Sequence, residues 1–181
     1  MLYSFEGKTP RISPDTYVRD SAEIIGDVTV GPRCYIGPGA VIRGDAVPIT
    51  IDEETAVEDG VIIHAGGAED HCHIGKRVTI GHAAVVHSLE VGDGVSIGIS
   101  AVLSLGSIIG KDSIIGECAL VPKKHVVPEK SLVAGVPAKP LRELSEKDIS
   151  IWSKTKDYYV ELVARYLAEG SILPVKRDDS E

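Results

Sequence analysis

Residues 91–133 read VGDGVSIGISAVLSLGSIIGKDSIIGECALVPKKHVVPEKSLV, and every sixth residue of this stretch is aliphatic. The series consists of Val91, Ile97, Leu103, Ile109, Ile115, Val121, Val127 and Val133. A short repeat of constant length is typical of a solenoid, and a six-residue period indicates a parallel β-helix. Each hexapeptide then forms one flat face, and a few faces close one coil.

The same period continues toward the N-terminus. Its earlier members are Val18, Ile24, Val30, Ile36 and Ile42, then Ile51, Val57 and Ile63, then Ile74, Ile80 and Val86. Glycine often follows the aliphatic residue directly, and a second inward position four residues later is mostly small or β-branched. If three faces close a coil, the whole series makes about six coils. The sequence therefore predicts an all-β solenoid as the fold class.

Two stretches interrupt the period, and a different pattern follows it. Residues 43–50 break the series first, and residues 65–73, AGGAEDHCH, are polar and glycine-rich, so we expect them to leave the coil as an extruded loop. Residues 1–140 are predicted to form the β-helix, and residues 141–181 a C-terminal α-helix and tail. Ser145 resembles a helix N-cap, and apolar residues recur at helical spacing from Ile149 to Tyr166.

Composition limits the classes of partner. The formal net charge of −8 disfavours nucleic acid, because phosphate binding requires concentrated Lys and Arg. The N-terminus has no apolar segment typical of a signal peptide, and no stretch approaches the length of a membrane span. Three cysteines form no disulfide pattern. We therefore expect a cytoplasmic protein with neither a membrane nor a nucleic acid as partner.

The histidines carry the strongest chemical signal. His64 and His87 each follow an inward aliphatic residue directly, so they occupy equivalent outward positions on neighbouring coils. Strands about 4.8 Å apart can bring such rings within ligand distance of one ion. His82 belongs to the preceding face, so one prism cannot aim all three at one point. Three prisms around a threefold axis can, which predicts a homotrimer with a metal at each interface.

A second arrangement of metal ligands is also conceivable. His71, Cys72 and His73 lie together in the extruded loop, and a His-Cys-His sequence has ligand chemistry. No fourth ligand is evident beside them, so the site formed by the three separated histidines is the favoured hypothesis.

The chain resembles the γ-class carbonic anhydrases, which are trimeric left-handed β-helix proteins of the hexapeptide-repeat superfamily. The resemblance covers essentially the whole chain. It includes the motifs GKTP (7–10), VIRGD (41–45), EDGVIIH (58–64), TIGHAAVVH (79–87), AGVPAK (134–139) and RELSEKD (142–148). The left-handed coil is implied by this resemblance, since nothing in the residue spacing indicates the hand.

The resemblance also implies the roles of single residues. His64, His82 and His87 would be the metal ligands, with zinc as the expected ion and iron or cobalt as alternatives. Arg43 and Asp45 would lie beside the metal as catalytic residues, and Glu69 would be a proton shuttle in the loop. Glu58 would be a further catalytic residue, and it is a departure, because the family commonly has Gln there. An amide can donate a hydrogen bond, whereas an ionised carboxylate can only accept one.

The expected function is reversible hydration of carbon dioxide to bicarbonate. Two alternatives remain. The chain could be a hexapeptide acyltransferase that uses a coenzyme A thioester and a histidine base. It could also be a catalytically weak metal-bound scaffold, an alternative that Glu58 favours more than any other residue does.

Overall fold

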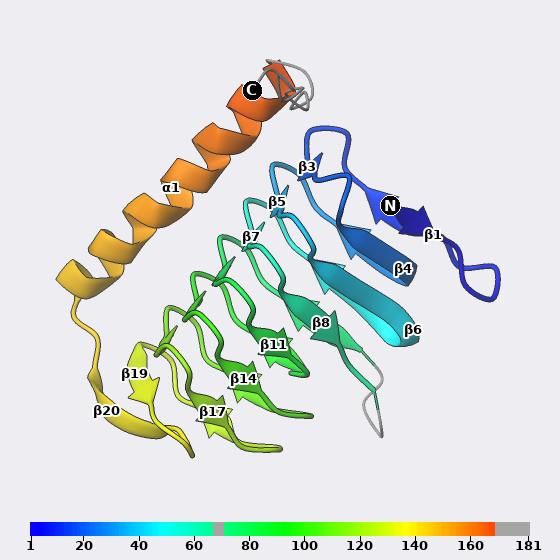
Figure 1. Cartoon of the computed structure of the whole chain (residues 1–181). Coiled ribbons are helices and arrows are strands. Elements are labelled where there is room, and N and C mark those ends of the chain that lie inside the picture. Colours follow the sequence, from blue (N-terminus) through cyan, green and yellow to red (C-terminus); the bar gives the residue numbers. More distant parts are fainter. Residues whose placement is uncertain (67–70, 169–181) are drawn as a thin grey trace, which may run out of the picture.

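The structure is a computed structural model that describes residues 1–66 and 71–168. Three faces of short strands wind around one axis, and the one helix of the described residues, α1 (Glu146–Ala168), lies along the outside of this prism (Figure 1). Within the described residues, all strand pairs between consecutive coils are parallel, and β20 (Lys139–Glu143) alone among the strands pairs antiparallel. The predicted solenoid with a C-terminal helix is confirmed.

We name the three faces by their strands. Face A contains β1 (Leu2–Tyr3), the first parts of β4 (Glu23–Val30) and β6 (Val41–Ile51), then β8 (Ile62–His64), β11 (Val85–Val86), β14 (Val102–Leu103) and β17 (Leu120–Val121). Face B contains β2 (Arg11–Ile12), the second parts of β4 and β6, then β9 (Cys72–Ile74), β12 (Glu90–Val91), β15 (Ile108–Ile109) and β18 (Val126–Val127). Face C contains β3 (Tyr17–Val18), β5 (Tyr35–Ile36), β7 (Ala56–Val57), β10 (Thr79–Ile80), β13 (Ser96–Ile97), β16 (Ile114–Ile115), β19 (Ser131–Ala134) and β20.

The described residues form about seven coils, so the expectation of about six was one too low. The additional coil contains β1 and β2, which pair with β4 through Leu2–Ile24 and Ile12–Val30. A small hairpin between Phe5 and Lys8 separates these two strands. Because that hairpin breaks the six-residue spacing, the sequence period did not reveal this coil.

The aliphatic series fills the interior, as predicted. Parallel pairing stacks equivalent residues of successive coils, for example Ile80 on Val57 and Ile97 on Ile80. From Ile24 to Val133 every member of the series is at most 2% exposed. Burying aliphatic area is the main favourable contribution to folding, so these three inward columns stabilise the prism.

The recurring glycine has a steric cause. A Cβ atom added at Gly98 would lie 2.5 Å from the amide nitrogen of Glu117 on the next coil, and one added at Gly81 would lie 2.8 Å from the carbonyl oxygen of Ile97. Real Cβ atoms essentially never approach other atoms so closely. Glycine therefore follows the inward aliphatic residue because the backbone of the next coil passes directly beside it.

The first interruption, at residues 43–50, stays within the sheet. Pairing of β4 with β6 moves from Gly26–Gly44 to Val28–Ile49, so the one intervening residue of β4, Asp27, lies opposite four residues of β6, 45–48. The resulting bulge follows Gly44 and includes Asp45. Bulges re-aim side chains and are common beside functional sites.

The second interruption is shorter than expected at its C-terminal end. Cys72 and His73 belong to β9, where His73 pairs with Thr50 on one side and with Glu90 on the other. Of the segment expected to leave the coil, residues 67–70 lie outside the described residues.

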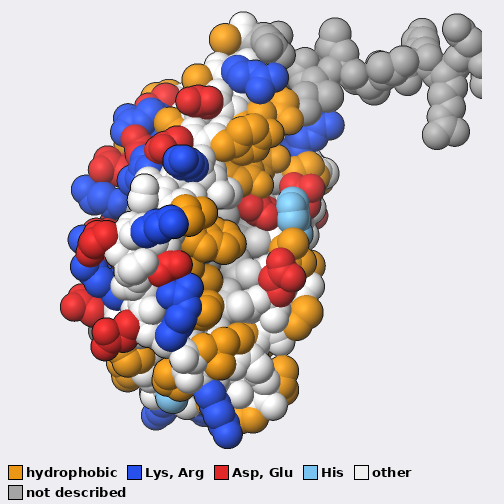
Figure 2. Space-filling model, turned by 90° about the vertical axis from the view of Figure 1, so that its left-hand side faces the viewer, with side chains coloured by type: hydrophobic (Ala, Val, Ile, Leu, Met, Phe, Trp, Pro, Cys, Tyr) orange, Lys and Arg blue, Asp and Glu red, His pale blue; other side chains and the backbone are white. Residues whose placement is uncertain are grey.

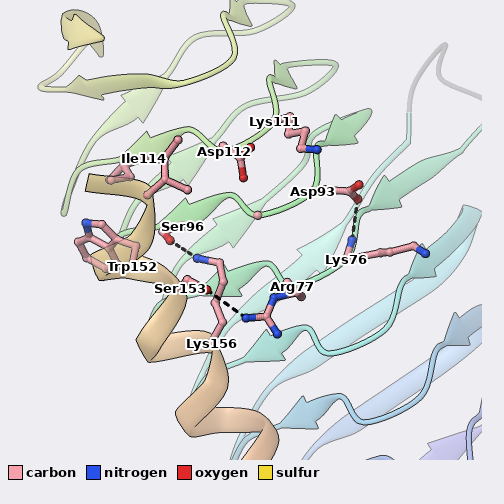
Figure 3. A pocket seen from close by; sticks show the side chains of 12 residues that line it. Lys76, Arg77, Asp93, Ser96, Lys111, Asp112, Ile114, Trp152, Ser153 and Lys156 are labelled. Carbon is pink, nitrogen blue, oxygen red and sulfur yellow. Dashed lines mark hydrogen bonds between the residues drawn. The ribbon is translucent and has the colours of Figure 1, made fainter. Parts of the chain in front are cut away.

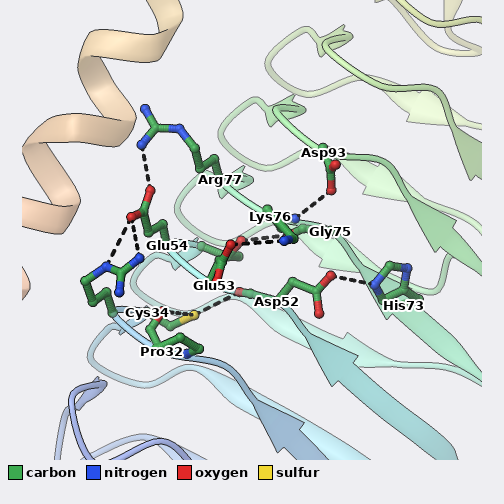
Figure 4. Close-up of polar contacts among 12 residues, drawn as sticks. Pro32, Cys34, Asp52, Glu53, Glu54, His73, Gly75, Lys76, Arg77 and Asp93 are labelled. Carbon is green, nitrogen blue, oxygen red and sulfur yellow. Dashed lines mark hydrogen bonds and ion pairs between the residues drawn. The ribbon is translucent and has the colours of Figure 1, made fainter.

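A polar column on face B crosses three coils. His73 Nε2 lies 3.0 Å from Asp52 Oδ2 (Figure 4), and His73 Nδ1 lies 2.7 Å from Glu90 Oε1. Burial alone would lower the pKa of His73, but the hydrogen bonds to both carboxylates outweigh it and raise that pKa. When protonated, the imidazole can donate to both carboxylates, and it thus connects three consecutive coils.

The helix begins as the sequence predicts. Ser145 Oγ accepts a hydrogen bond from the backbone N–H of Asp148, and Asp148 Oδ2 accepts one from the backbone N–H of Ser145, which is a capping box. Val163 and Lys156 are the buried residues of α1. No helix among the described residues is both long and apolar enough to cross a membrane.

We expect Gly98→Ala to lower the free energy of unfolding by about 3 kcal/mol, because the added methyl group meets rigid backbone. Gly39→Ala is the matched control. Its Cβ has no neighbour closer than 3.9 Å, and only its φ of +67° is unfavourable, which costs about 1 kcal/mol. Urea unfolding of both variants measures the difference, and an equal loss would contradict the steric explanation.

The His73 column predicts a pH dependence of stability. Folding raises the pKa of His73 above 6.5. The stability that His73 contributes is therefore complete below about pH 6.5, and it is lost as the pH rises through the pKa of the folded state. The three side chains are about one third exposed, so we expect a loss of no more than about 1 kcal/mol. Urea unfolding of wild type and His73→Gln across pH measures it, and a difference between them that does not change with pH would contradict this assignment.

Candidate metal centre

Coil register brings Arg43, His64 and His87 into one column at the edge of face A that leads to face B. Arg43 pairs with His64, and β8 pairs with β11 in the register that places His87 beside His64. His64 Nδ1 and His87 Nε2 are 3.1 Å apart, and the two rings meet edge to face. These two histidines therefore lie together, as their equivalent outward positions predict.

Asp45 joins this column from the bulge of β6. Its Oδ1 lies 3.2 Å from His64 Nε2, and its Oδ2 lies 3.5 Å from a guanidinium nitrogen of Arg43. Asp45 Oδ1 is buried and lacks a partner with hydrogen-bond geometry among the described residues. Burial, followed by the charges of His64 and Arg43, lowers the pKa of His87. His87 is thus held in the neutral form that binds metals.

His82 lies at the opposite edge of face A, at the corner that follows β10. Its backbone N–H donates to Glu58 Oε2 at 3.1 Å, and its Nε2 lies 3.1 Å from the same oxygen. Glu58 is only 7% exposed. The carboxylate that the sequence marked as a departure is therefore attached to His82 and does not touch the column of His64 and His87.

The helix contributes a residue that the sequence analysis did not assign to the site. Burial, followed by a hydrogen bond with Glu58, raises the pKa of Tyr159. The helical spacing placed Tyr159 on the inward stripe of α1, but only the packing of α1 on the prism brings it to Glu58. Asp59 Oδ2 lies 3.7 Å from His82 Nδ1, so the group around His82 consists of Glu58, Asp59 and Tyr159.

The candidate residues form two half-sites, one at each edge of face A. The first half-site contains Arg43, Asp45, His64 and His87, and the second contains Glu58 and His82. Within the described part of a single chain, no three His, Cys, Asp or Glu side chains are placed to hold a metal ion. One chain therefore presents these two groups of candidate residues on opposite edges of one face.

Face A between the half-sites is apolar and uncovered. Its outward positions stack Val41, Ile62, Val85, Val102 and Leu120 in one column. Ile62 is 43% and Val102 is 36% exposed. Figure 2 shows the neighbouring side of the molecule, on which α1 lies, and there too hydrophobic side chains form a band bordered by charged ones. Contiguous exposed apolar side chains are typical of protein interfaces.

The alternative site at residues 71–73 does not form. Cys72 points into the core and is 1% exposed, and burial, with a smaller effect of Glu90, raises the pKa of its thiol to about 12. His73 lies on the outer surface with Asp52 and Glu90. Adjacent residues of a strand point to opposite sides, so Cys72 and His73 cannot share an ion. Glu69, the expected proton shuttle, lies outside the described residues.

The residues of the first half-site fit a divalent metal. Nitrogen ligands 2.0–2.1 Å from a tetrahedral ion lie about 3.4 Å apart, close to the 3.1 Å between His64 and His87. The second nitrogen of His64 faces Asp45, as in the carboxylate–histidine pairs that orient metal ligands. The same buried Asp45 oxygen lacks a hydrogen-bond partner within the described residues.

Several known proteins are similar to this chain in sequence or in structure. Residues 9–44 match the family described as "Bacterial transferase hexapeptide (six repeats)". A "Carbonic anhydrase" of Geobacillus kaustophilus is 38% identical over 93% of this chain and 92% of its own. The "Carnitine operon protein CaiE" of Salmonella newport is 34% identical over 86% of this chain and 79% of its own.

A solved structure extends the comparison to the fold. A hexapeptide transferase family protein from Anaplasma phagocytophilum has a TM-score of 0.85 and 30% identity, covering 91% of this chain and 97% of that one. The structural neighbours are left-handed β-helices, so the expected hand is confirmed. With the 38% identity to the Geobacillus protein, these similarities show that the chain belongs to the γ-class carbonic anhydrase family of hexapeptide-repeat proteins.

Proposed function

We propose that this protein is a metal-dependent carbonic anhydrase that hydrates carbon dioxide reversibly to bicarbonate. The observation that carries the proposal is the convergence of His64 and His87, with His82 held at the opposite edge of the same face. Three copies around a threefold axis would place His82 of the partner subunit against His64 and His87. The aliphatic column of face A supports this arrangement, because burial between subunits would remove it from water.

The residues of each half-site have separate roles in this proposal. His64 and His87 would hold the ion, which we expect to be zinc, or else iron or cobalt. A bound divalent ion supplies the Lewis acidity that makes water a nucleophile near neutral pH. Asp45 orients His64 through its ring nitrogen, and Arg43 holds Asp45. Glu58 accepts the backbone N–H of His82 and so sets the position of the third ligand.

A second candidate function is acyl transfer from a coenzyme A thioester. The family description and the name of the Anaplasma protein favour it. In that case a single histidine would be the general base. The paired histidines with a carboxylate behind them exceed what one base requires, and this difference favours carbon dioxide hydration. A catalytically weak scaffold would retain the metal but show neither activity.

The deciding experiment is a carbon dioxide hydration assay on metal-replete protein, with elemental analysis of the same sample. We expect stoichiometric metal and measurable hydration. Coenzyme A release from acetyl thioesters is measured in parallel with amine acceptors. Release without hydration would support the acyltransferase function, and metal without either activity would support the scaffold.

The shared site predicts complementation between subunits. His82→Ala and His87→Ala homotrimers should each lose their metal, because two histidines are too few to retain it against water. Co-expressed in equal amounts, the two chains assemble mixed trimers in which about one quarter of the interfaces combine an intact His87 with an intact His82. Elemental analysis should recover that fraction of metal and activity.

The control is co-expression of His64→Ala with His87→Ala, which lie in the same half-site and cannot complement each other. Sedimentation should give about three times the chain mass of 19.2 kDa for every combination. Metal recovery in the control, or full metal content in monomers, would contradict the shared site.

The contacts of Glu58 predict a mild effect of Glu58→Gln. The amide oxygen can still accept the backbone N–H of His82, so the ligand stays in place. We expect kcat/KM for carbon dioxide hydration to be unchanged or higher, because a negative charge that repels bicarbonate is removed. A fall of about a hundredfold or more, the range for a lost acid or base, would identify Glu58 as a proton-transfer residue. Both proteins are compared at equal metal content across pH.

A further inference from the structure

A cavity lies between α1 and the prism, away from both half-sites. The C-terminal half of α1 packs closely on face C, where Tyr159 and Tyr166 meet Tyr17 and Tyr35. The N-terminal half stands over β13 and β16 and leaves a space of about 290 Å³ (Figure 3). Exposed side chains at its rim include Trp152 and Lys111, so the cavity opens to solvent.

Lys156 reaches into this cavity from α1. It is 4% exposed, and its Nζ donates to Ser96 Oγ at 2.7 Å. Among the described residues it forms no ion pair. An ammonium group has three protons to donate, and a buried one without a carboxylate partner is costly. The neutral amine has a lone pair and needs fewer partners, so this environment favours it.

The charge of Arg77 also favours the neutral amine of Lys156. Burial, followed by the charge of Arg77, lowers the pKa of Lys156 to about 8, although Asp112 and Asp157 oppose the shift. Arg77 is held in place by Glu54 at 2.7 Å and by Asp157 at 2.6 Å, so its charge stays near the amine. Lys111 lines the same cavity and forms no ion pair with any described residue. A group that became anionic here would share the cavity with the cations Arg77 and Lys111 and with the carboxylates Asp93 and Asp112.

We propose that Lys156 is a carbamylation site, at which its neutral amine adds carbon dioxide. The amine nitrogen forms a bond to the carbon atom, one C=O π pair moves to oxygen, and one N–H proton leaves to solvent. The product is an N-carboxylated lysine with one negative charge, and no oxidant or reductant is needed. Ser96 can accept from the amine before the reaction and donate to a carbamate oxygen after it.

The site is distinct from the proposed metal centre and does not depend on it. The added group has three heavy atoms, which the cavity accommodates without displacing α1. The modification replaces the buried amine by an anion in a cavity that Arg77 and Lys111 help to line. It would therefore change the charge between the helix and the prism in response to carbon dioxide.

The test is trapping of the carbamate in the intact wild-type protein. Metal-free and metal-replete samples are incubated with ¹³C-bicarbonate near pH 8, ethylated with a trialkyloxonium salt, digested and mapped by mass spectrometry. Lys154 is the matched control, because it is an exposed lysine on the same helix. Lowering the pKa from 10.5 to about 8 raises the free-amine fraction by about two orders of magnitude near neutral pH. We expect at least about tenfold more label on Lys156 than on Lys154.

Lys156→Arg should lose this label and any bicarbonate-dependent rise in Tm that wild type shows. Equal labelling of Lys154 and Lys156, or none on Lys156, would overturn the proposal. Because the site is mapped in wild type, this result holds even if the variant folds poorly. Labelling in metal-free protein keeps the outcome separate from the proposed hydration activity.

Discussion

Close stacking of one coil on the next is the constraint on which the rest of this structure depends. Parallel strands a few ångströms apart place each side chain directly above its equivalent on the preceding coil. Inside, this stacks Ile and Val into continuous columns. At the corners it leaves no room for a Cβ at positions such as Gly98. On the outer surface, close stacking makes residues about twenty positions apart in the sequence direct neighbours.

The polar columns follow from that constraint and differ only in chemistry. On face B, His73 lies between Asp52 and Glu90, and their opposite charges satisfy one another. At the edge of face A, His64 lies against His87, and two imidazoles that face each other cannot satisfy one another in the same way. The first column stabilises the prism, whereas the second is suited to a cation between the rings. The same geometry thus serves stability in one place and a candidate function in another.

The helix adds contacts that coil stacking cannot provide. Tyr159 reaches Glu58 across the gap between α1 and the prism, and Arg77 reaches Asp157 from the corner of the coil. Both contacts join residues more than seventy positions apart. Where the helix diverges from the prism, Lys156 is buried without an anionic partner among the described residues. These features depend on how a helix lies on a face, and no repeat encodes that placement.

The amino-acid sequence by itself determined the period, the inward columns, the helix cap and the equivalence of His64 and His87, because each depends on local spacing. It did not reveal the first coil, since a hairpin disrupts the spacing there. It also did not show that Cys72 and His73 belong to a strand, since a polar stretch resembles a loop. Only the tertiary structure decided that Glu58 touches His82, that Asp45 reaches His64 and that Lys156 is buried. Those contacts depend on a bulge, a corner and a docked helix, whose positions are set by packing between distant segments.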